Sequence, residues 1–195
     1  MDSHADSCGV NHEAKILETY GQAAEVSEFS DSCQPLQDVP MVKAAIAYDN
    51  PNTGETVILI INQAFYFVGD KLTHILLNPN QMRSNNIQVD DIPKHLSTTS
   101  LHSIIAAEDN FVILLNLKEI MPCFHARTPS IMETETCQNI VLTSKEECYL
   151  YSPHFEDLER EAKNINDQLE IAAVTSHCIE YSDLILEEVK TKRFL

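Results

Sequence analysis

Short apolar runs, separated by polar and turn-forming residues, dominate the first 150 positions of the chain. Runs of this length that are rich in β-branched and aromatic residues predict β-strands. We expect strands at positions 14–19, 41–48, 56–61, 64–68, 72–77, 111–117, 120–127 and 139–143. The turn-forming residues from Asp49 to Glu55 predict a β-hairpin with an exposed tip. Proline suits the first turn of a helix, so a short helix is expected from Pro79 to Asn85.

The hydrophobic period changes over the last forty residues. Apolar side chains there are spaced three and four apart, which predicts one face of a helix formed by Phe155, Leu158, Ala162, Ile165 and Leu169. This stripe indicates a helix packed on a core, or a seam for a partner. A second helix is expected from Ser182 to Lys192, whereas Ile171 to Val174 is also compatible with an edge strand. The polar stretch Ser97–Ser100 indicates a boundary after Pro93. The pattern therefore predicts a β domain over 1–92, a β-rich extension over 93–152 and a helical tail over 153–195.

The amino-acid composition limits the kinds of function that the protein can have. With 195 residues, of which 44% are hydrophobic, the chain can form one sizeable domain or a small domain with an appendage. The 13 Lys and Arg against 30 Asp and Glu give a net charge of −17, so we expect no direct nucleic-acid binding. The sequence has no apolar run of about 18 residues, which a membrane-spanning helix would need. It also lacks the basic and apolar regions of a signal peptide. We expect an intracellular, cytoplasmic protein that does not bind membranes.

Cysteine and glycine usage excludes further classes. The six cysteines are scattered without a C-x-x-C pair, so we expect reduced thiols in place of a disulfide framework: Cys8, Cys33, Cys123, Cys137, Cys148 and Cys178. With only 4 glycines the chain has no Gly-rich phosphate loop. Cys123 and His125 alternate on a predicted strand, but no signature of a thiol nucleophile accompanies them. The dispersed histidines, including His102, are expected to be surface or hydrogen-bonded residues.

The N-terminal block from Asp2 to Cys8 is dense in chemically active side chains. A metal site is one interpretation, because the spacing of His4, Cys8 and His12 would align them on a helix, with Asp2 and Asp6 as further ligands. Asp, Ser and Gly disfavour a helix interior, which counts against it. The other interpretation is a carboxylate that activates water together with a second carboxylate from a dimer partner. Cap or turn residues near a chain end are the third.

The order of the following segments resembles the retropepsin-type aspartic proteases of retrotransposon polyproteins. Asp2-Ser3-His4-Ala5-Asp6 stands where that family carries Asp-Ser/Thr-Gly-Ala-Asp, and the 41–61 hairpin follows in the place of the flap. Leu76–Arg83 is similar to the Leu-Leu-Ser-x-x-Gln-Leu segment of copia-type elements. The sequences Val89–His95 and Ile140–Ser144 also resemble this group. The resemblance covers about residues 2–150.

The resemblance implies a mainly β, retropepsin-like fold (an acid-protease half) with additional strands and the C-terminal helical tail, so α+β overall. It implies that Asp2 is the catalytic aspartate and that the Ser3 hydroxyl ties together the two active-site turns of a homodimer. The implied activity is hydrolysis of a peptide or polyprotein substrate, without a metal or an organic cofactor.

Three departures from the family lead us to expect a degenerate or inactive protease. His4 replaces the glycine beneath the carboxylates, and Asn78 stands where retroviral enzymes favour glycine. The chain also begins one residue before Asp2, without the strand that delivers the aspartate to its turn. The alternative is a non-catalytic structural or interaction domain of a mobile-element protein.

Overall fold

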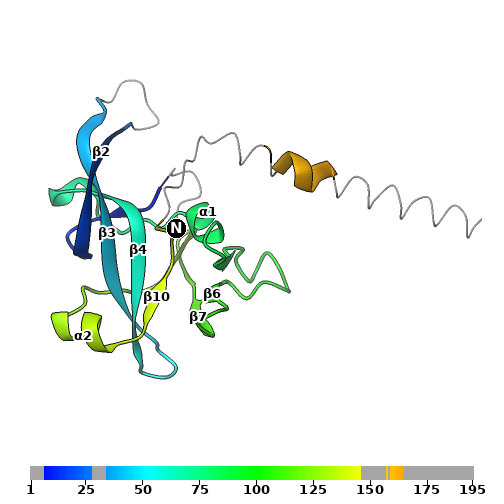
Figure 1. Cartoon of the computed structure of the whole chain (residues 1–195). Helices are drawn as coiled ribbons and strands as arrows, with labels where there is room; N and C mark the ends of the chain where they lie inside the picture. Colours follow the sequence, from blue (N-terminus) through cyan, green and yellow to red (C-terminus); the bar gives the residue numbers. More distant parts are fainter. Residues whose placement is uncertain (1–6, 28–33, 146–156, 158, 165–195) are drawn as a thin grey trace, which may run out of the picture. The chain divides into compact units, whose positions relative to one another are not determined.

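The computed structural model describes residues 7–27, 34–145, 157 and 159–164. The chain divides into two compact units, residues 1–148 and 149–195. The first unit is mainly β (Figure 1). This confirms the predicted predominance of strands, whereas the narrower retropepsin-like assignment stays a prediction.

The largest sheet is built around one central strand, β4 (Thr56–Tyr66). On one side, β4 pairs antiparallel with β3 (Leu36–Asp49), which in turn pairs with the edge strand β2 (Lys15–Val26). On the other side, two short strands pair parallel with β4. β10 (Asn139–Val141) lies beside Ile58–Ile60, and β1 (Gly9–Val10) lies beside Phe65 and Tyr66. Two segments from opposite ends of the unit therefore share one edge of β4.

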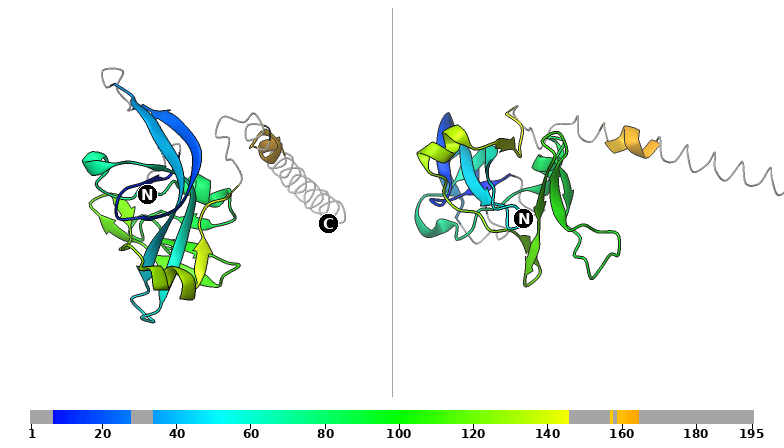
Figure 2. Two further views of the ribbon diagram at one scale, coloured as in Figure 1. Left: turned by 60° about the vertical axis from the view of Figure 1, so that its left-hand side comes forward. Right: turned by 90° about the horizontal axis from the view of Figure 1, so that it is seen from below.

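The remaining elements are short. They comprise η1 (Gly69–Lys71), α1 (Pro79–Arg83), a three-stranded antiparallel sheet of β5 (Gln88–Asp90), β6 (Ser103–Ala106) and β7 (Phe111–Leu114), a two-stranded ribbon of β8 (Asn116–Lys118) and β9 (Met121–Cys123), and α2 (Ile131–Thr136). Figure 2 shows the β5–β7 sheet as a separate layer beside the main sheet.

The nearly continuous apolar sequences of β3 and β4 are explained by burial on both faces. Side chains alternate across a strand, so consecutive residues enter different clusters. One face contributes to the main core, whose members include Ala44, Ile46, Leu59 and Ile61 from these strands and Val10, Ile104, Ile113 and Ile140 from others. The opposite face forms a smaller cluster of Ala45, Ala47, Ile58 and Ile60, against which Cys137 packs. Residues on both sides of position 92 thus share one core.

Aromatic contacts join the layers. The ring of Tyr48 meets those of Phe111 and Phe124 edge to face, with centroids 5.9 and 5.7 Å apart. Edge-to-face geometry brings the positive rim of one ring to the negative face of the other. Burial raises the pKa of Tyr48, against a hydrogen bond with the backbone of Leu114. The ring therefore stays neutral and ties β3 to β7.

The hairpin and the first helix were both predicted correctly from short stretches of sequence. The turn from Asn50 to Glu55 joins β3 and β4, closed by hydrogen bonds from Asn50 N to Glu55 O at 2.9 Å and from Gly54 N to Asn50 O at 2.8 Å. Gly54 has a φ of 73°, a backbone conformation that favours glycine. The predicted helix from Pro79 is confirmed as α1.

Four strand predictions were wrong in detail. The run 111–117 forms two strands, β7 and the start of β8. The apolar run 64–68 is the end of β4 and not a separate strand. The run 120–127 contributes only β9. The run 72–77 forms no strand; its Leu76 makes an isolated antiparallel bridge with Gly9. Because β1 is only two residues long, it has no further residues with which the 72–77 segment could pair as a strand.

The predicted helical tail is described only in part. Residues 157 and 159–164 are helical and exposed. The rest of the predicted stripe, the second helix and the 171–174 segment lie outside the described residues. Within the part of the chain that is described, no helix is long and apolar enough to span a membrane.

Candidate active-site region

The predicted catalytic residues, Asp2 and Ser3, lie outside the described residues, as does the whole Asp2–Asp6 motif. Ser7 is the first residue that the structure describes. The contacts of Cys8 and Gly9 therefore show where the chain lies immediately after the motif.

Cys8 is held on three sides. Its backbone N–H donates to Gln81 Oε1 at 2.9 Å, and its carbonyl accepts from the N–H of Phe65 at 2.9 Å. The backbone N–H of Asn78 donates to the Cys8 sulfur at 3.2 Å. The side chain of Cys8 is fully buried. The segment that leaves the motif is thus fixed to both β4 and α1.

Gly9 is enclosed between Leu76 and β4. Its N–H donates to Leu76 O at 2.9 Å, and the N–H of Leu76 donates back to Gly9 O at 2.8 Å. A Cβ atom on Gly9 would lie 3.1 Å from Phe67 Cε2 and 3.3 Å from Leu72 Cδ2. Both distances are tighter than ordinary van der Waals contacts. The absence of a side chain at position 9 therefore lets the backbone approach its neighbours closely.

Helix α1 begins at an asparagine cap. Asn78 Oδ1 accepts from the N–H groups of Asn80 at 2.7 Å and Gln81 at 2.9 Å, and Pro79 occupies the first turn. These bonds satisfy donors that a helix start otherwise leaves without partners. The φ of Asn78 is −84°, so its backbone conformation does not require glycine.

Gln81 connects α1 to two other segments. Its Oε1 accepts from Cys8, while its Nε2 donates to the carbonyl of Gln63 at 3.3 Å. Gln81 is only 3% exposed, so both ends of its amide are satisfied inside the protein. The polar contacts at this end of the sheet are therefore buried and neutral.

The thiol of Cys8 is expected to be unreactive. Burial raises the pKa of Cys8 to about 12, and the smaller opposing effect is the hydrogen bond from the backbone of Asn78. Metal ligation requires a thiolate, and Cys8 precedes a strand, which breaks the helical spacing with His12. Cys8 is thus unsuited to the metal site considered from the sequence. In the described ranges, no three His, Cys, Asp or Glu residues come together to hold a metal.

A second buried polar contact fastens the chain beyond β10 to β4. Asn62 donates from its backbone N–H to Thr143 Oγ1 and from Nδ2 to Thr143 O, both at 2.7 Å. Its Oδ1 accepts from the hydroxyl of Tyr20 at 3.3 Å. Gln63 Nε2 donates to the carbonyl of Lys145 at 2.8 Å. Strand β10 is thereby secured at its C-terminal end.

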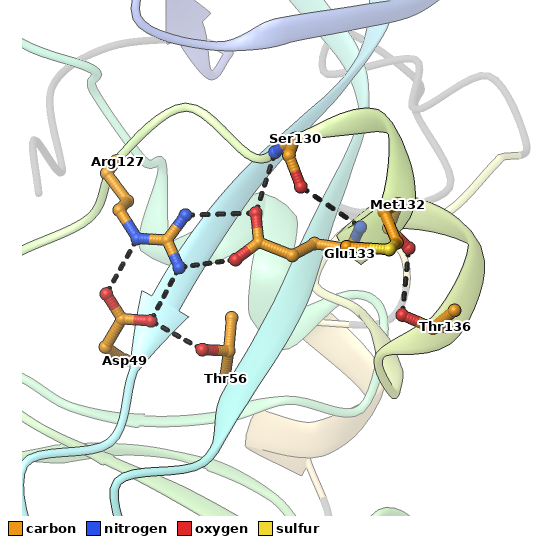
Figure 3. A network of polar contacts seen from close by, with 7 residues as sticks. All are labelled: Asp49, Thr56, Arg127, Ser130, Met132, Glu133 and Thr136. Carbon is orange, nitrogen blue, oxygen red and sulfur yellow. Dashed lines mark hydrogen bonds and ion pairs between the residues drawn. The ribbon is translucent and has the colours of Figure 1, made fainter.

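The opposite end of β3 and β4 carries an exposed ionic cluster (Figure 3). The guanidinium of Arg127 donates to both oxygens of Asp49 at 2.8 and 2.9 Å and to both oxygens of Glu133 at 3.1 and 2.7 Å. Ser130 and Glu133 form a capping box at the start of α2. Thr56 donates to Asp49 at 2.7 Å. The cluster joins the end of β3 to α2.

The two carboxylates of this cluster do not form an acid–base pair. The hydrogen bonds from Arg127 lower the pKa of Asp49 and lower that of Glu133 to about 2, and they raise the pKa of Arg127. Both acids are therefore ionised near neutral pH, whereas a catalytic dyad shares one proton. The arrangement is typical of a structural ion pair.

β1 and the 50–55 turn lie at different ends of the main sheet. β1 pairs at Phe65, which lies opposite Met41, whereas the turn follows the pair Asp49 and Thr56. Phe65 is nine positions from Thr56 along β4, a length of about 30 Å. Figure 1 shows the turn at the bottom of the sheet and the arm formed by β2 and β3 at the top. The hairpin is confirmed, and its tip lies at the end of β4 opposite to the pairing with β1, whereas its assignment as a flap stays a prediction.

His102 departs from the expectation for the histidines. It is 5% exposed, and its Nε2 has no hydrogen-bond partner among the residues that the structure describes. Its backbone N–H donates to Asp90 Oδ2 at 3.3 Å. Leu101 and Ser100 also donate to the carboxylate of Asp90. Asp90 therefore closes the neck of the loop between β5 and β6.

The roles of Gln81, Cys8 and Asn62 were not visible in the sequence. Each forms contacts across more than 60 positions of the chain, and no local motif marks such pairs. The one usable signal was the Asn78-Pro79 pair, which is typical of a helix start.

Comparison of the chain with family models, with curated proteins and with solved structures found no match.

Proposed function

We propose that this chain is a retropepsin-like aspartic endopeptidase module of a copia-like retrotransposon polyprotein, with weak or lost activity. The observation that supports this most is the attachment of Cys8 to Asn78 and Gln81. It joins the segment that follows the Asp2–Asp6 motif to the Leu76–Arg83 segment. These are the two parts of the sequence that carry the family resemblance, and they are 70 residues apart.

The proposed chemistry needs two copies of the chain. A single Asp2 carboxylate per chain forms a dyad only when a second chain supplies its own Asp2. Two adjacent carboxylates cannot both ionise, so the pair retains one proton and acts as acid and base on a water molecule. That water attacks the carbonyl carbon of a peptide substrate. The hydroxyl of Ser3 would join the two active-site turns.

The departures from the family at Asn78 and His4 should affect activity to different extents. Asn78 caps α1 at a negative φ, so this position functions without the family's glycine. His4 introduces a side chain at the turn beneath the carboxylates, where glycine permits a tight backbone. We therefore assign the expected loss of activity to His4.

The arm formed by β2 and β3 is the better candidate for the flap. Its outer part pairs Ala23 with Pro40 and Val26 with Leu36, beyond the Met41 position where β1 reaches the sheet. An isolated two-stranded ribbon is marginally stable, so its outer part can move relative to the core. We therefore propose this arm as the flap, in place of the 41–61 hairpin.

Cleavage of a peptide library near pH 5 tests the proposal. We expect weak cleavage by the wild type and a clear gain from His4→Gly, because glycine restores the tight turn. Asp2→Asn in the His4→Gly background should abolish cleavage, as should a pepstatin-type inhibitor. Asp6→Asn, the matched control, should retain most of it.

Two results would contradict the endopeptidase. Cleavage that survives Asp2→Asn would exclude the aspartic mechanism. A folded, dimeric His4→Gly protein that cleaves no peptide would favour the alternative, a non-catalytic structural or interaction domain.

A further inference from the structure

The outer edge of β10 faces away from β4. Gln138 O accepts from Ile58 N at 2.9 Å, and Leu142 N donates to Ile60 O at 2.8 Å, so residues 138 and 142 direct their backbone groups toward β4. Alternate residues of a strand direct their backbone hydrogen-bonding groups to opposite edges. Asn139 and Val141 therefore direct theirs away from β4. Among the described residues, no other strand pairs with this edge.

A groove lies along this outer edge. Its volume is about 320 Å³, and Asn139 and Val141 form one wall. The opposite side comes from residues 85–87 after α1 and from residues 106–109 at the β6–β7 turn. Ile87 and Ala106, which are buried, provide an apolar floor. The side chain of Asn85 already donates from Nδ2 to Val141 O at 2.9 Å, which confirms that this carbonyl faces the groove.

The charge of the groove selects its partner. Glu108 and Asp109 are exposed at the rim, and neither forms an ion pair with any described residue. Of the charged residues that the structure describes, only these two acids line the groove. An extended segment with a positively charged side chain matches both the backbone edge and the rim.

We propose that the outer edge of β10 binds an extended, basic peptide segment by strand addition. The backbone of the segment pairs with Asn139 and with the N–H of Val141, because the Val141 carbonyl already accepts from Asn85. A Lys or Arg side chain of the segment reaches Glu108 and Asp109. This site lies beside the Ile58–Ile60 part of β4, away from the Phe65 end where the motif enters. It therefore does not depend on the proposed endopeptidase activity.

The probe is the hexapeptide acetyl-Thr-Val-Thr-Lys-Val-Thr-amide, titrated into the full-length ¹⁵N-labelled protein at low ionic strength. We expect saturable amide shifts at residues 85–87, 106–109 and 139–141, with slower hydrogen exchange at Asn139. Replacement of the peptide's Lys by Glu should weaken binding about fivefold or more, the effect of a surface charge pair worth about 1 kcal/mol. N-methylation of the peptide's pairing amides should abolish binding.

Matched variants separate charge at the groove from charge in general. Glu108→Gln with Asp109→Asn should remove the preference for Lys over Glu. Glu18→Gln with Glu119→Gln, two exposed acids outside the groove, should leave the preference unchanged.

Three results would overturn the proposal. They are a lack of saturable shifts at 139–141, equal binding of the Lys and Glu peptides, and equal loss of preference in both double variants. Protection of Asn139 that rises with protein concentration in the absence of peptide would instead assign the edge to a second copy of the chain.

Discussion

The two ends of the β3–β4 pair are held together by opposite kinds of polar contact. At the Phe65 end, Cys8 and Gln81 form neutral hydrogen bonds that are buried. At the Asp49 end, Arg127 and its two carboxylates form ion pairs in which the side chains of Arg127 and Asp49 are 43% and 51% exposed. A buried polar group that loses its partner costs about 1–3 kcal/mol, whereas a surface ion pair contributes about 0–1 kcal/mol. Substitutions at the Phe65 end should therefore lower the stability of the protein more than substitutions at the charged Asp49 end.

The largest expected effect is at Gln81. Gln81→Met keeps the length of the side chain but removes the acceptor for the N–H of Cys8 and a donor to the carbonyl of Gln63. We expect the free energy of unfolding to fall by about 2–4 kcal/mol, from the loss of two buried hydrogen bonds. Urea denaturation measures it. Gln88→Met, an exposed control, should change stability by less than about 0.5 kcal/mol. Equal effects of the two substitutions would contradict the importance of burial.

Close packing at Gly9 should have the next largest effect. Gly9→Ala places a Cβ against Phe67 and Leu72. We expect a loss of about 1–3 kcal/mol, because side chains or backbone must shift to accept it. Thermal unfolding followed by circular dichroism provides the measurement. An unchanged or raised melting temperature would show that the neighbours yield without cost.

A smaller effect is expected at the cap of α1. Asn78→Ala removes the acceptor for Asn80 and Gln81 and should cost about 1 kcal/mol. Asn78→Gly, which introduces the residue favoured by retroviral enzymes, should cost only a few tenths of a kcal/mol. Denaturant unfolding of both variants gives the comparison. A glycine variant less stable than the alanine variant would be inconsistent with a capping role.

The smallest effect at neutral pH is expected for Arg127→Met, and it should depend on pH. The carboxylates of Asp49 and Glu133 have lowered pKa values in the folded protein, so their pairing stabilises it above the ordinary carboxyl range, near pH 4. That contribution is lost as the pH falls toward the folded pKa of Glu133, about 2.

The stability difference between wild type and Arg127→Met should accordingly shrink from pH 6 to pH 2, and also with added salt. Unfolding curves across this pH range measure it. A difference that grows on acidification would have the wrong sign for an ion pair.

Local chemistry explains what the sequence predicted well. The turn from Asn50 to Glu55 and the Pro79 helix are specified by residues a few positions apart, whose conformational preferences act without the rest of the fold. The apolar runs 41–48 and 56–61 likewise predicted the strands that the structure shows as parts of β3 and β4.

Non-local contacts explain what the sequence did not predict. Leu72–Leu77 has the composition of a strand, but among the described residues its only strand partner is the two-residue β1. Composition cannot reveal how long that partner is. Hairpin chemistry likewise locates the turn at Asn50 to Glu55 but not the end of the sheet at which the turn lies. Gln81 and Cys8 are 73 positions apart, and no spacing rule joins them.

The dependence of cleavage on protein concentration tests the central claim most directly. We propose a dyad built from the Asp2 residues of two chains, so the specific activity of the His4→Gly variant should rise with protein concentration, in step with the dimer fraction measured by sedimentation. Asp2→Asn should remove the signal at every concentration. A specific activity that stays constant down to concentrations at which the protein is monomeric would contradict the two-chain aspartic mechanism.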